Sequence, residues 1–237
     1  RDRYRYVYHA LNRVHGYAGL GLQAPVEVLG IGSAYGEELQ PVLELARHIT
    51  IVDPSDAFVR EHIGPVPCRY VKPMVSGQLP FTDAQFDLVT ALGVLHHVPN
   101  VSTVVKEISR VMRPGANLLL REPVVSMGDW RVPRTGLTKH ERGIPLALLR
   151  SMIHDAGLTV RRESLCVFPP LSGLVRRINP AIYNSVFWTR VDAILSWAFR
   201  WNLTYHATSS WRKFRPTSAF FVLQKPDVAH GKDASGS

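Results

Sequence analysis

The chain has 237 residues, is 46% hydrophobic and carries a formal net charge of +9. A chain of this length can bury a full core, so we expect one domain, 1–237, with added segments. Its longest helix-like apolar region, 181–203, is interrupted by Arg190, Asp192 and Arg200, which excludes a membrane span because charges at a bilayer centre are costly.

The basic excess allows nucleic acid, an anionic lipid surface or an acidic substrate as partner, and it selects none of them. The basic residues are scattered without an RNA-binding motif, so nucleic acid is not an expected partner. The two cysteines, Cys68 and Cys166, lie far apart, and the charged start, 1–5, has no signal-peptide pattern. We therefore expect a cytoplasmic protein with reduced thiols. No metal site is predicted, because adjacent histidines such as His96 and His97 point in different directions on a regular element.

The predicted elements alternate along the chain. Apolar residues at helical spacing predict an N-terminal helix that ends near Gly16, within a segment 1–20. The core segment, 21–168, follows with strands expected at 26–30, 49–53, 68–72, 86–92, 117–121 and 158–168, and helices at 37–48, 55–62, 101–112 and 145–155. A last strand is expected at 217–224, within a segment 216–225. This alternation predicts a Rossmann-like α/β fold, a doubly wound and mostly parallel seven-stranded sheet covered on both faces.

A segment before the last strand, 169–215, is too long for a hairpin connection, so we expect a helical insertion. Asn179-Pro180 is a typical helix start. Four tryptophans stand among its arginines: Trp188, Trp197, Trp201 and Trp211. Two interpretations follow. The insertion packs over the sheet or at a homodimer interface, or it is an interfacial helix that brings the protein to a lipid-linked substrate. The tail, 226–237, is expected to be disordered.

Residues 28–36 read V-L-G-I-G-S-A-Y-G, and the next apolar stretch, Ile51-Val52-Asp53, ends in a carboxylate. A glycine-spaced turn after one strand and an acid after the next grip an adenosine at the carboxyl ends of the strands. The glycines let the backbone approach the ligand, and the acid accepts two ribose hydroxyls. The turn alone also occurs in NAD(P) enzymes and in ordinary strand-to-helix connections.

Four further motifs follow in order: Leu-Pro-Phe at 79–81, Phe-Asp-Leu-Val at 86–89, Leu-His-His-Val at 95–98 and a run ending in Arg-Pro-Gly at 106–115. Together with the glycine turn, this series resembles the class I S-adenosylmethionine (SAM) dependent methyltransferases, particularly the type 11 group, over about 26–125. The resemblance implies an antiparallel last strand and an N-terminal helix that caps the cofactor site. It also implies that the methionine part of SAM lies on Gly30 to Gly36, the ribose on Asp53 and the adenine on Met74 to Ser76.

The cofactor contacts that we expect from the resemblance are Gly30, Gly32, Ser33, Gly36, Asp53, Val75, Ser76 and Leu92. The chain departs from the family pattern at three places. Gly30 replaces an acid that helps to fix the ammonium of the cofactor, Ala34 replaces a glycine, and Val75 replaces an acid beside the adenine. Glu27 and Glu37 are the nearest substitutes for the first acid.

Methyl transfer from a sulfonium is an in-line displacement in which positioning supplies much of the rate. A base is needed only for a hydroxyl or a protonated amine. His97, just after the fourth strand, is the first candidate, with His96 as the alternative. His140 and Glu141, in a polar loop after the fifth strand, form the second candidate cluster.

We therefore expect a SAM-dependent methyltransferase that acts on a small-molecule, glycan or lipid-linked acceptor at oxygen. Peripheral contact with the inner face of the membrane and a homodimer are further expectations about partners. One alternative is a non-catalytic partner or regulatory subunit with the cofactor fold, favoured by the three departures. Another is an NAD(P) oxidoreductase, which would not explain the series from Leu-Pro-Phe to Arg-Pro-Gly.

Overall fold

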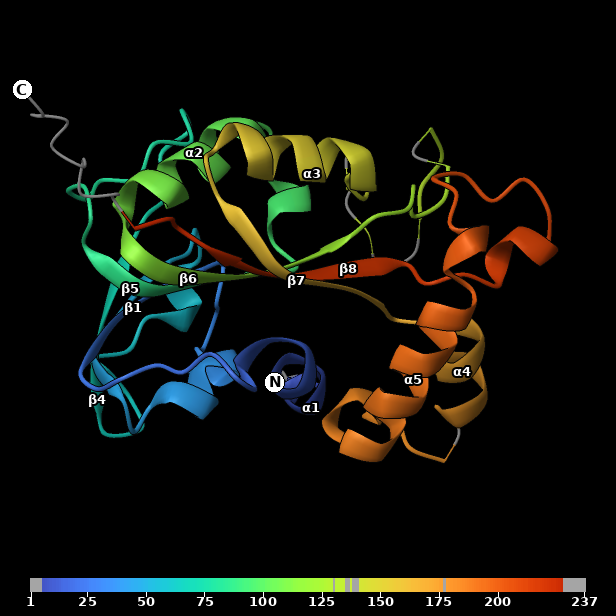
Figure 1. Cartoon of the computed structure of the whole chain (residues 1–237), viewed down its shortest axis with the longest axis horizontal. Helices are drawn as coiled ribbons and strands as arrows, with labels where there is room; N and C mark the ends of the chain where they lie inside the picture. The colour runs from blue at the N-terminus through green and yellow to red at the C-terminus, as the bar shows by residue number, and fades with distance from the viewer. Residues whose placement is uncertain (1–5, 130, 135–136, 138–140, 177, 228–237) are drawn as a thin grey trace, which may run out of the picture.

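The computed structural model describes residues 6–129, 131–134, 137, 141–176 and 178–227. An eight-stranded sheet crosses the molecule in the order β3-β4-β2-β1-β5-β6-β8-β7 (Figure 1). Its strands are β1 Val26–Ile31, β2 Ala46–Val52, β3 His62–Ile63, β4 Val66–Val71, β5 Phe86–Leu92, β6 Met112–Pro123, β7 Thr159–Cys166 and β8 Ser218–Gln224.

The strands β4, β2, β1, β5 and β6 pair in parallel, so their carboxyl ends meet at one edge of the sheet. The last strand, β8, is antiparallel to both β6 and β7. These pairings confirm the predicted Rossmann-like sheet with an antiparallel last strand. The predicted count of seven strands was one short, because β3 forms a two-residue antiparallel pair with β4 across a turn at Gly64. Gly64 has φ +56, a conformation that favours glycine.

The α-helices are α1 His9–Asn12, α2 Val101–Val111, α3 Leu146–Asp155, α4 Pro169–Val175 and α5 Val186–Ala198, and a π-helical turn, Arg13–Tyr17, continues α1. Short 3-10 turns lie at Glu37–Val42, Asp56–Phe58, Leu95–His97, Ile182–Asn184, Arg200–Asn202 and Trp211–Lys213. In Figure 1, α2 and α3 cover one face of the sheet, α1 lies on the opposite face, and α4 and α5 stand beside each other at one end. No helix in the described part of the chain is long and apolar enough to cross a membrane.

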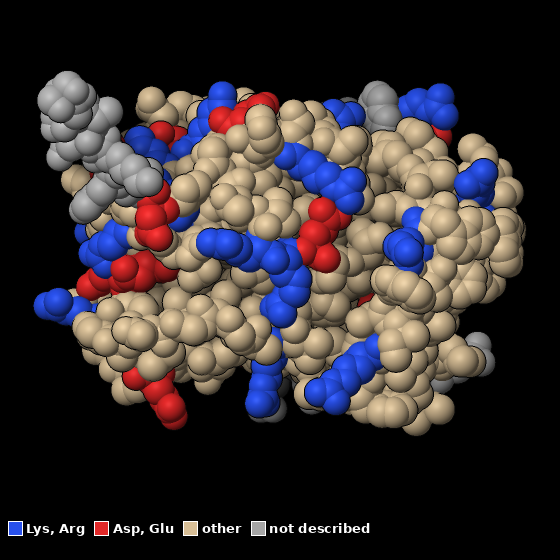
Figure 2. Space-filling model, viewed as in Figure 1, with Lys and Arg blue, Asp and Glu red and all other residues tan. Residues whose placement is uncertain are grey.

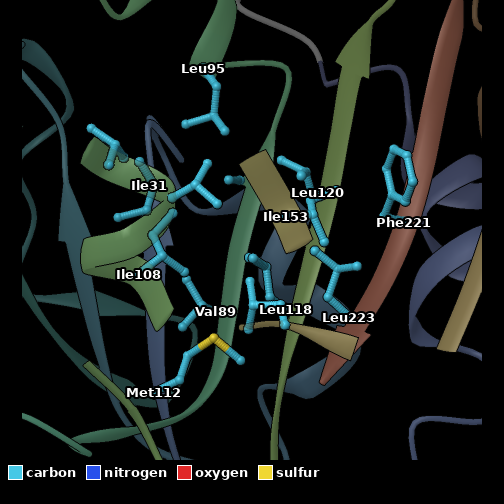
Figure 3. Packing of buried hydrophobic residues seen from close by; sticks show 14 of the residues in the cluster. Ile31, Val89, Leu95, Ile108, Met112, Leu118, Leu120, Ile153, Phe221 and Leu223 are labelled. Carbon is cyan, nitrogen blue, oxygen red and sulfur yellow. The ribbon is translucent and has the colours of Figure 1, made fainter. Parts of the chain in front are cut away.

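Buried apolar side chains pack on both faces of the sheet. On the face of α2 and α3, Ile108 and Ile153 meet Val89, Leu118 and Leu120 from the strands (Figure 3). The buried positions of α2 recur at the spacing of one helical face, which explains why this helix was predictable. On the opposite face, α1 and the insertion 169–215 share a second core with the sheet. The insertion is therefore anchored to the domain.

Several predicted boundaries were wrong. The helix expected at 37–48 ends at Val42, and β2 begins already at Ala46. Pro41 lies inside this turn, and a proline lacks the N–H that a longer helix needs. The helix expected at 55–62 is a single 3-10 turn, and β3 takes up its end. The helix after Asn179-Pro180 begins only at Val186, where the Ser185 hydroxyl accepts from the Trp188 N–H.

Candidate functional site: two cavities joined at the glycine turn

Two cavities open at the carboxyl edge of the parallel strands, and Gly32 lines both of them. The larger has a volume of about 620 Å³ and is lined by Ser33, Leu92 and His96, with Tyr6 and Tyr8 from the N-terminal segment. The smaller has a volume of about 370 Å³ and reaches the segment 73–75. We call them the large and the small cavity. The predicted glycine turn therefore lies between the two cavities, where it would contact the middle of a ligand that occupied both.

The glycine turn has the backbone that its sequence suggests. Gly32 and Gly36 have φ +65 and φ +72, and Ala34 adopts φ +45. A Cβ on Gly32 would overlap the Val94 side chain, and one on Gly36 would overlap Ile63. Ala34 is held in its uncommon conformation from two sides: its N–H donates to Asp53 (3.2 Å) and its carbonyl accepts from the Tyr70 hydroxyl (2.9 Å). The alanine that departs from the family pattern is therefore accommodated.

Asp53 directly follows β2 and lies beside this turn. Its carboxylate accepts the N–H groups of Ala34 and Ser55 (2.9 Å) and is buried. It lines a third cavity, of about 330 Å³, whereas its neighbours Val52 and Pro54 line the small cavity. A carboxylate has more acceptor positions than these two bonds use. The ribose contact assigned to Asp53 stays a prediction.

Glu38 supplies a buried acid at the turn, and the sequence analysis missed it. Its Oε1 accepts the hydroxyls of Ser33 (2.6 Å) and Thr90 (3.0 Å), and its side chain lines the large cavity. A Cβ on Gly30 would overlap Ser33 Oγ, so this pair fills the space beside Gly30. Burial raises the pKa of Glu38 to about 7, against opposing hydrogen bonds from the two hydroxyls.

The two substitutes named from the sequence lie elsewhere. Glu27 is at the far end of β1 and faces His48 (3.4 Å). Glu37 accepts the N–H of Tyr6 (3.2 Å) and does not line either cavity at Gly32. Sequence spacing could not choose between Glu37 and Glu38, because the expected regular helix there does not form.

Val75 and Ser76 lie in the loop that borders the small cavity. Val75 lines this cavity but is 94% exposed. The amide of Asn100 donates to the carbonyls of Val75 (3.2 Å) and Ser76 (3.4 Å) and holds this loop against the start of α2. A backbone contact of this loop with the adenine, in place of the acid that the family carries there, stays a prediction.

His96 is fixed by a buried carboxylate from the neighbouring strand. Glu122, near the end of β6, is fully buried and accepts the N–H groups of Val94 (2.9 Å) and Leu95 (2.7 Å). Its other oxygen lies 2.7 Å from His96 Nδ1. In the neutral ring, a proton on Nδ1 directed at Glu122 makes Nε2 of His96 an acceptor. Glu122 was also missed, because nothing local in Arg-Glu-Pro marks a partner of the turn after β5.

Glu141 joins this group from the loop before α3. Its two oxygens lie 3.6 Å from His96 Nε2 and 3.6 Å from His97 Nδ1. The histidine rings are 4.0 Å apart, although His96 lines the large cavity and His97 the small one. Burial and the neighbouring His96 lower the pKa of His97. His140 lies outside the described residues.

The expectation that His96 and His97 point in different directions assumed a regular element, whereas they lie in a 3-10 turn. One ligand atom each from His96, His97 and Glu141 lies within 4.8 Å of the others, so this group could hold a metal ion. The 3-10 turn Leu95–His97 brings both rings to the same carboxylate, where a strand or an α-helix would separate them. The absence of a metal stays a prediction.

Arg121 places a buried positive charge on the wall of the large cavity. It lies in β6, its guanidinium is 4.0 Å from the centre of the Tyr8 ring, and it donates to Asn12 Oδ1 (3.1 Å). Tyr6, Val7 and Tyr8, just before α1, line this cavity, so the N-terminal segment covers it. Arg121 was not predictable, since a lone arginine in a strand gives no signal of its contacts.

Residues 29–120 match the family model described as a methyltransferase domain, and this match spans both the glycine turn and the Leu-His-His motif. Over these residues the chain is similar to the methyltransferase domains of SAM-dependent enzymes. The cofactor of such enzymes is SAM. The chain is 27% identical, over 192 residues, to the ubiquinone biosynthesis O-methyltransferase of Methylobacterium sp. (strain 4-46), covering 72% of this chain and 76% of that protein. It is 28% identical to the demethylmenaquinone methyltransferase of Streptomyces avermitilis, but spans only about half (51%) of that relative's length and 49% of its own.

Solved structures share the fold of this chain at low identity. The SAM-dependent methyltransferase from Mesorhizobium loti matches with a TM-score of 0.55 and 11% identity, covering 85% of this chain and 91% of that one. The [4+2]-cyclase SpnF matches with a TM-score of 0.59 and 17% identity, covering 92% and 81%. Because a cyclase shares the fold, the reaction has to be argued from the site.

Proposed function

We propose that this protein transfers the methyl group of SAM to an apolar small-molecule or lipid-linked acceptor, at oxygen. The observation that carries the proposal is the pair of cavities that meet at Gly32. SAM has an adenosine on one side of its sulfonium and a methionine tail on the other. A cofactor lying across Gly32 would place these parts in the small and the large cavity, with the sulfonium at the turn.

Opposite charges in the large cavity suit the methionine end. Glu38 would hold its ammonium and Arg121 its carboxylate, since both side chains line this cavity. Ser33 and Leu92 line the same cavity, and Gly30 and Gly36 belong to the turn that contains Gly32. Asp53, Val75 and Ser76 remain the assigned contacts of the adenosine. Val125, Met127 and Val167 give the remaining wall an apolar character. That wall favours an apolar acceptor over a glycan.

The pH dependence of SAM affinity tests the role of Glu38. Its pKa is raised from 4.5 to about 7 by burial, so the carboxyl is protonated at low pH and cannot attract an ammonium. SAM affinity should rise from pH 6 to pH 8, by at most about tenfold per pH unit below the pKa, and Glu38→Gln should abolish this slope. Calorimetric titration with SAM measures it. Glu37→Gln is the matched control and should keep the slope; a slope unchanged in Glu38→Gln contradicts the assignment.

The raised pKa of Glu38 also makes the free energy of unfolding depend on pH. A raised pKa means that the folded chain holds the Glu38 proton when the unfolded chain has lost it. The contribution to stability is therefore full below pH 4.5 and is lost as pH rises through 7. Relative to Glu38→Gln, the wild type's free energy of unfolding should fall by up to about 3 kcal/mol over that window.

The geometry supports His96 over His97 as the general base that takes the proton of a hydroxyl acceptor. The His96 ring lines the large cavity, and Glu122 orients it with Nε2 as the acceptor. A hydroxyl acceptor could pass its proton to this nitrogen as the methyl group arrives. Glu141, next to both rings, is a positioning residue in this scheme, and His97 and His140 remain candidates.

Labelled-methyl transfer tests both the reaction and the base. With methyl-labelled SAM and a panel of catechols, hydroquinones and polyprenyl phenols, the wild type should label at least one acceptor. His96→Ala should lower kcat about 10²- to 10⁴-fold at unchanged SAM affinity, and His97→Ala should lower it far less. SAM binding without labelling of any acceptor would favour the non-catalytic partner. Loss of activity with a chelator, restored by a divalent ion, would favour a metal at His96, His97 and Glu141 over a free base.

A further inference from the structure

The insertion, residues 169–215, carries most of the exposed large apolar side chains among the described residues. They are Leu174, Ile178, Val186, Phe187, Ile194, Trp197, Trp201, Trp211 and Phe214. Trp197 and Trp201 are 65% and 64% exposed. Trp211 lies near Trp201 and stacks on Phe214, with ring centres 6.3 Å and 5.6 Å apart, so these three exposed rings adjoin one another. Contiguous apolar surface of this kind marks an interaction site.

The helix α5 carries apolar side chains on two sides. Its fully buried positions are the polar Thr189, Asp192 and Ser196, and the partly buried Trp188, Val191 and Leu195 pack against the core. Phe187, Ile194 and Trp197 are exposed, at the spacing of one helical face. An ordinary surface helix buries its one apolar face, so the second, outward apolar face of α5 is open to another apolar environment.

Asp192 fixes this orientation. Its carboxylate accepts the N–H groups of Val167 (2.9 Å) and Phe168 (2.7 Å), just before α4, and the Tyr183 hydroxyl (3.0 Å). Rotating α5 to bury the tryptophans would break all three bonds and leave buried donors unpaired. The apolar face therefore points outward because of the fold, and the helix cannot turn it inward without cost.

The charge of the insertion is of one sign. Asp192 is its sole acidic residue and is buried, while the exposed basic residues are Arg176, Arg190, Arg200, Arg212 and Lys213. Arg200 lies 4.4 Å from the centre of the Trp197 ring, within the apolar patch. Figure 2 shows basic side chains standing on the largely uncharged surface over α4 and α5. The described part of the insertion thus exposes tryptophan and arginine but no acid, which is the composition of a membrane-interface element.

We propose that the insertion docks this protein on the surface of an anionic lipid bilayer, with the exposed Trp197, Trp201 and Trp211 at the headgroup boundary. A second copy of the chain fits the patch less well, because a symmetric contact would place the same arginines against each other. Val167, Thr217 and Ser218, at the base of the insertion, line the large cavity. Docking would bring that cavity close to the lipid.

Flotation with vesicles tests the proposal without cofactor or acceptor, so its outcome is independent of the proposed methyl transfer. The protein should bind vesicles of equimolar phosphatidylcholine and phosphatidylglycerol and bind pure phosphatidylcholine far less. Added salt should weaken the binding, because charge attraction is screened over about 10 Å at 0.1 M. Failure to bind the anionic vesicles at low salt would overturn the proposal, whatever the activity of the enzyme.

Variants separate lipid contact from folding. Trp197→Ser with Trp201→Ser should reduce vesicle affinity at least about tenfold without lowering Tm, because both side chains are exposed. Arg190→Gln with Lys213→Gln should weaken binding to the anionic vesicles and make that binding less sensitive to salt. The matched controls are Leu148→Ser on α3, an exposed apolar residue on the other side of the sheet, and Arg47→Gln on β2; both should bind like the wild type.

Two outcomes would assign the patch differently. If the tryptophan pair lowers Tm, the helix is a packed core element and the proposal fails. If the wild type sediments as a dimer without vesicles and the tryptophan variant sediments as a monomer, the patch is a contact between copies. Tryptophan fluorescence quenched by brominated acyl chains in the wild type, and much less in the double variant, would place the rings in lipid and support the proposal.

Discussion

Replacing Gly32 with valine should abolish SAM binding while leaving the chain folded. Gly32 lines both cavities, so an isopropyl group there would stand where the proposed cofactor crosses from one to the other. The new side chain would also overlap Val94 and sit at φ +65, which a β-branched residue rarely adopts. Calorimetric titration with SAM, S-adenosylhomocysteine and NADH measures the effect, and circular dichroism reports the fold. The wild type should bind the first two and not NADH.

Gly21→Val is the matched control for backbone strain. Gly21 has φ +63, nearly that of Gly32, and a Cβ at this position would meet no described atom within 4 Å. Backbone strain should destabilise the Gly21→Val variant by a similar amount, about 1–3 kcal/mol, and the variant should keep the SAM affinity of the wild type. If Gly32→Val is too unstable, adding Val94→Ala removes the overlap and leaves the isopropyl group between the cavities. SAM affinity retained in either valine variant at position 32 would mean that the cofactor binds elsewhere.

Asp53→Ala should weaken SAM binding by about 2–4 kcal/mol if both bonds to the ribose are lost. By RT ln of the affinity ratio, this is about 30- to 1000-fold. Asp53 also accepts the Ala34 N–H, so the variant should loosen the turn and lower Tm as well. Calorimetry and thermal unfolding of the same sample separate the two effects.

Asp56→Ala is the control for Asp53. Asp56 lies three residues further along the same loop, is exposed and pairs with Lys72 (2.5 Å). An exposed ion pair of this kind adds little stability, so SAM affinity and Tm should both stay near those of the wild type. Near-normal SAM affinity in Asp53→Ala would rule out the ribose assignment.

The strands and the turn chemistry were predictable because their signals are local. Apolar runs marked all seven expected strands, and the glycines at Gly32 and Gly36 do have positive φ. The helix 101–112 was predictable because its buried positions follow one helical face. The helix 37–48 was not, since a single Pro41 and the early start of β2 override an otherwise helical composition. Local propensity is a weak guide wherever the sheet competes for the same residues.

By itself, the sequence determined the alternating α/β order, the position of the glycine turn and the acid after β2, and the excess of positive charge in the insertion. Only the tertiary structure decided which acid lines the large cavity and which of the two cavities each histidine lines. Glu38 and Glu122 act through partners 52 and 26 residues away, Thr90 and His96, and no spacing rule connects such pairs. The outward face of α5 was likewise decided by the buried bonds of Asp192 to the chain before α4. Periodicity fixes which residues share a face, whereas long-range contacts decide which way that face points.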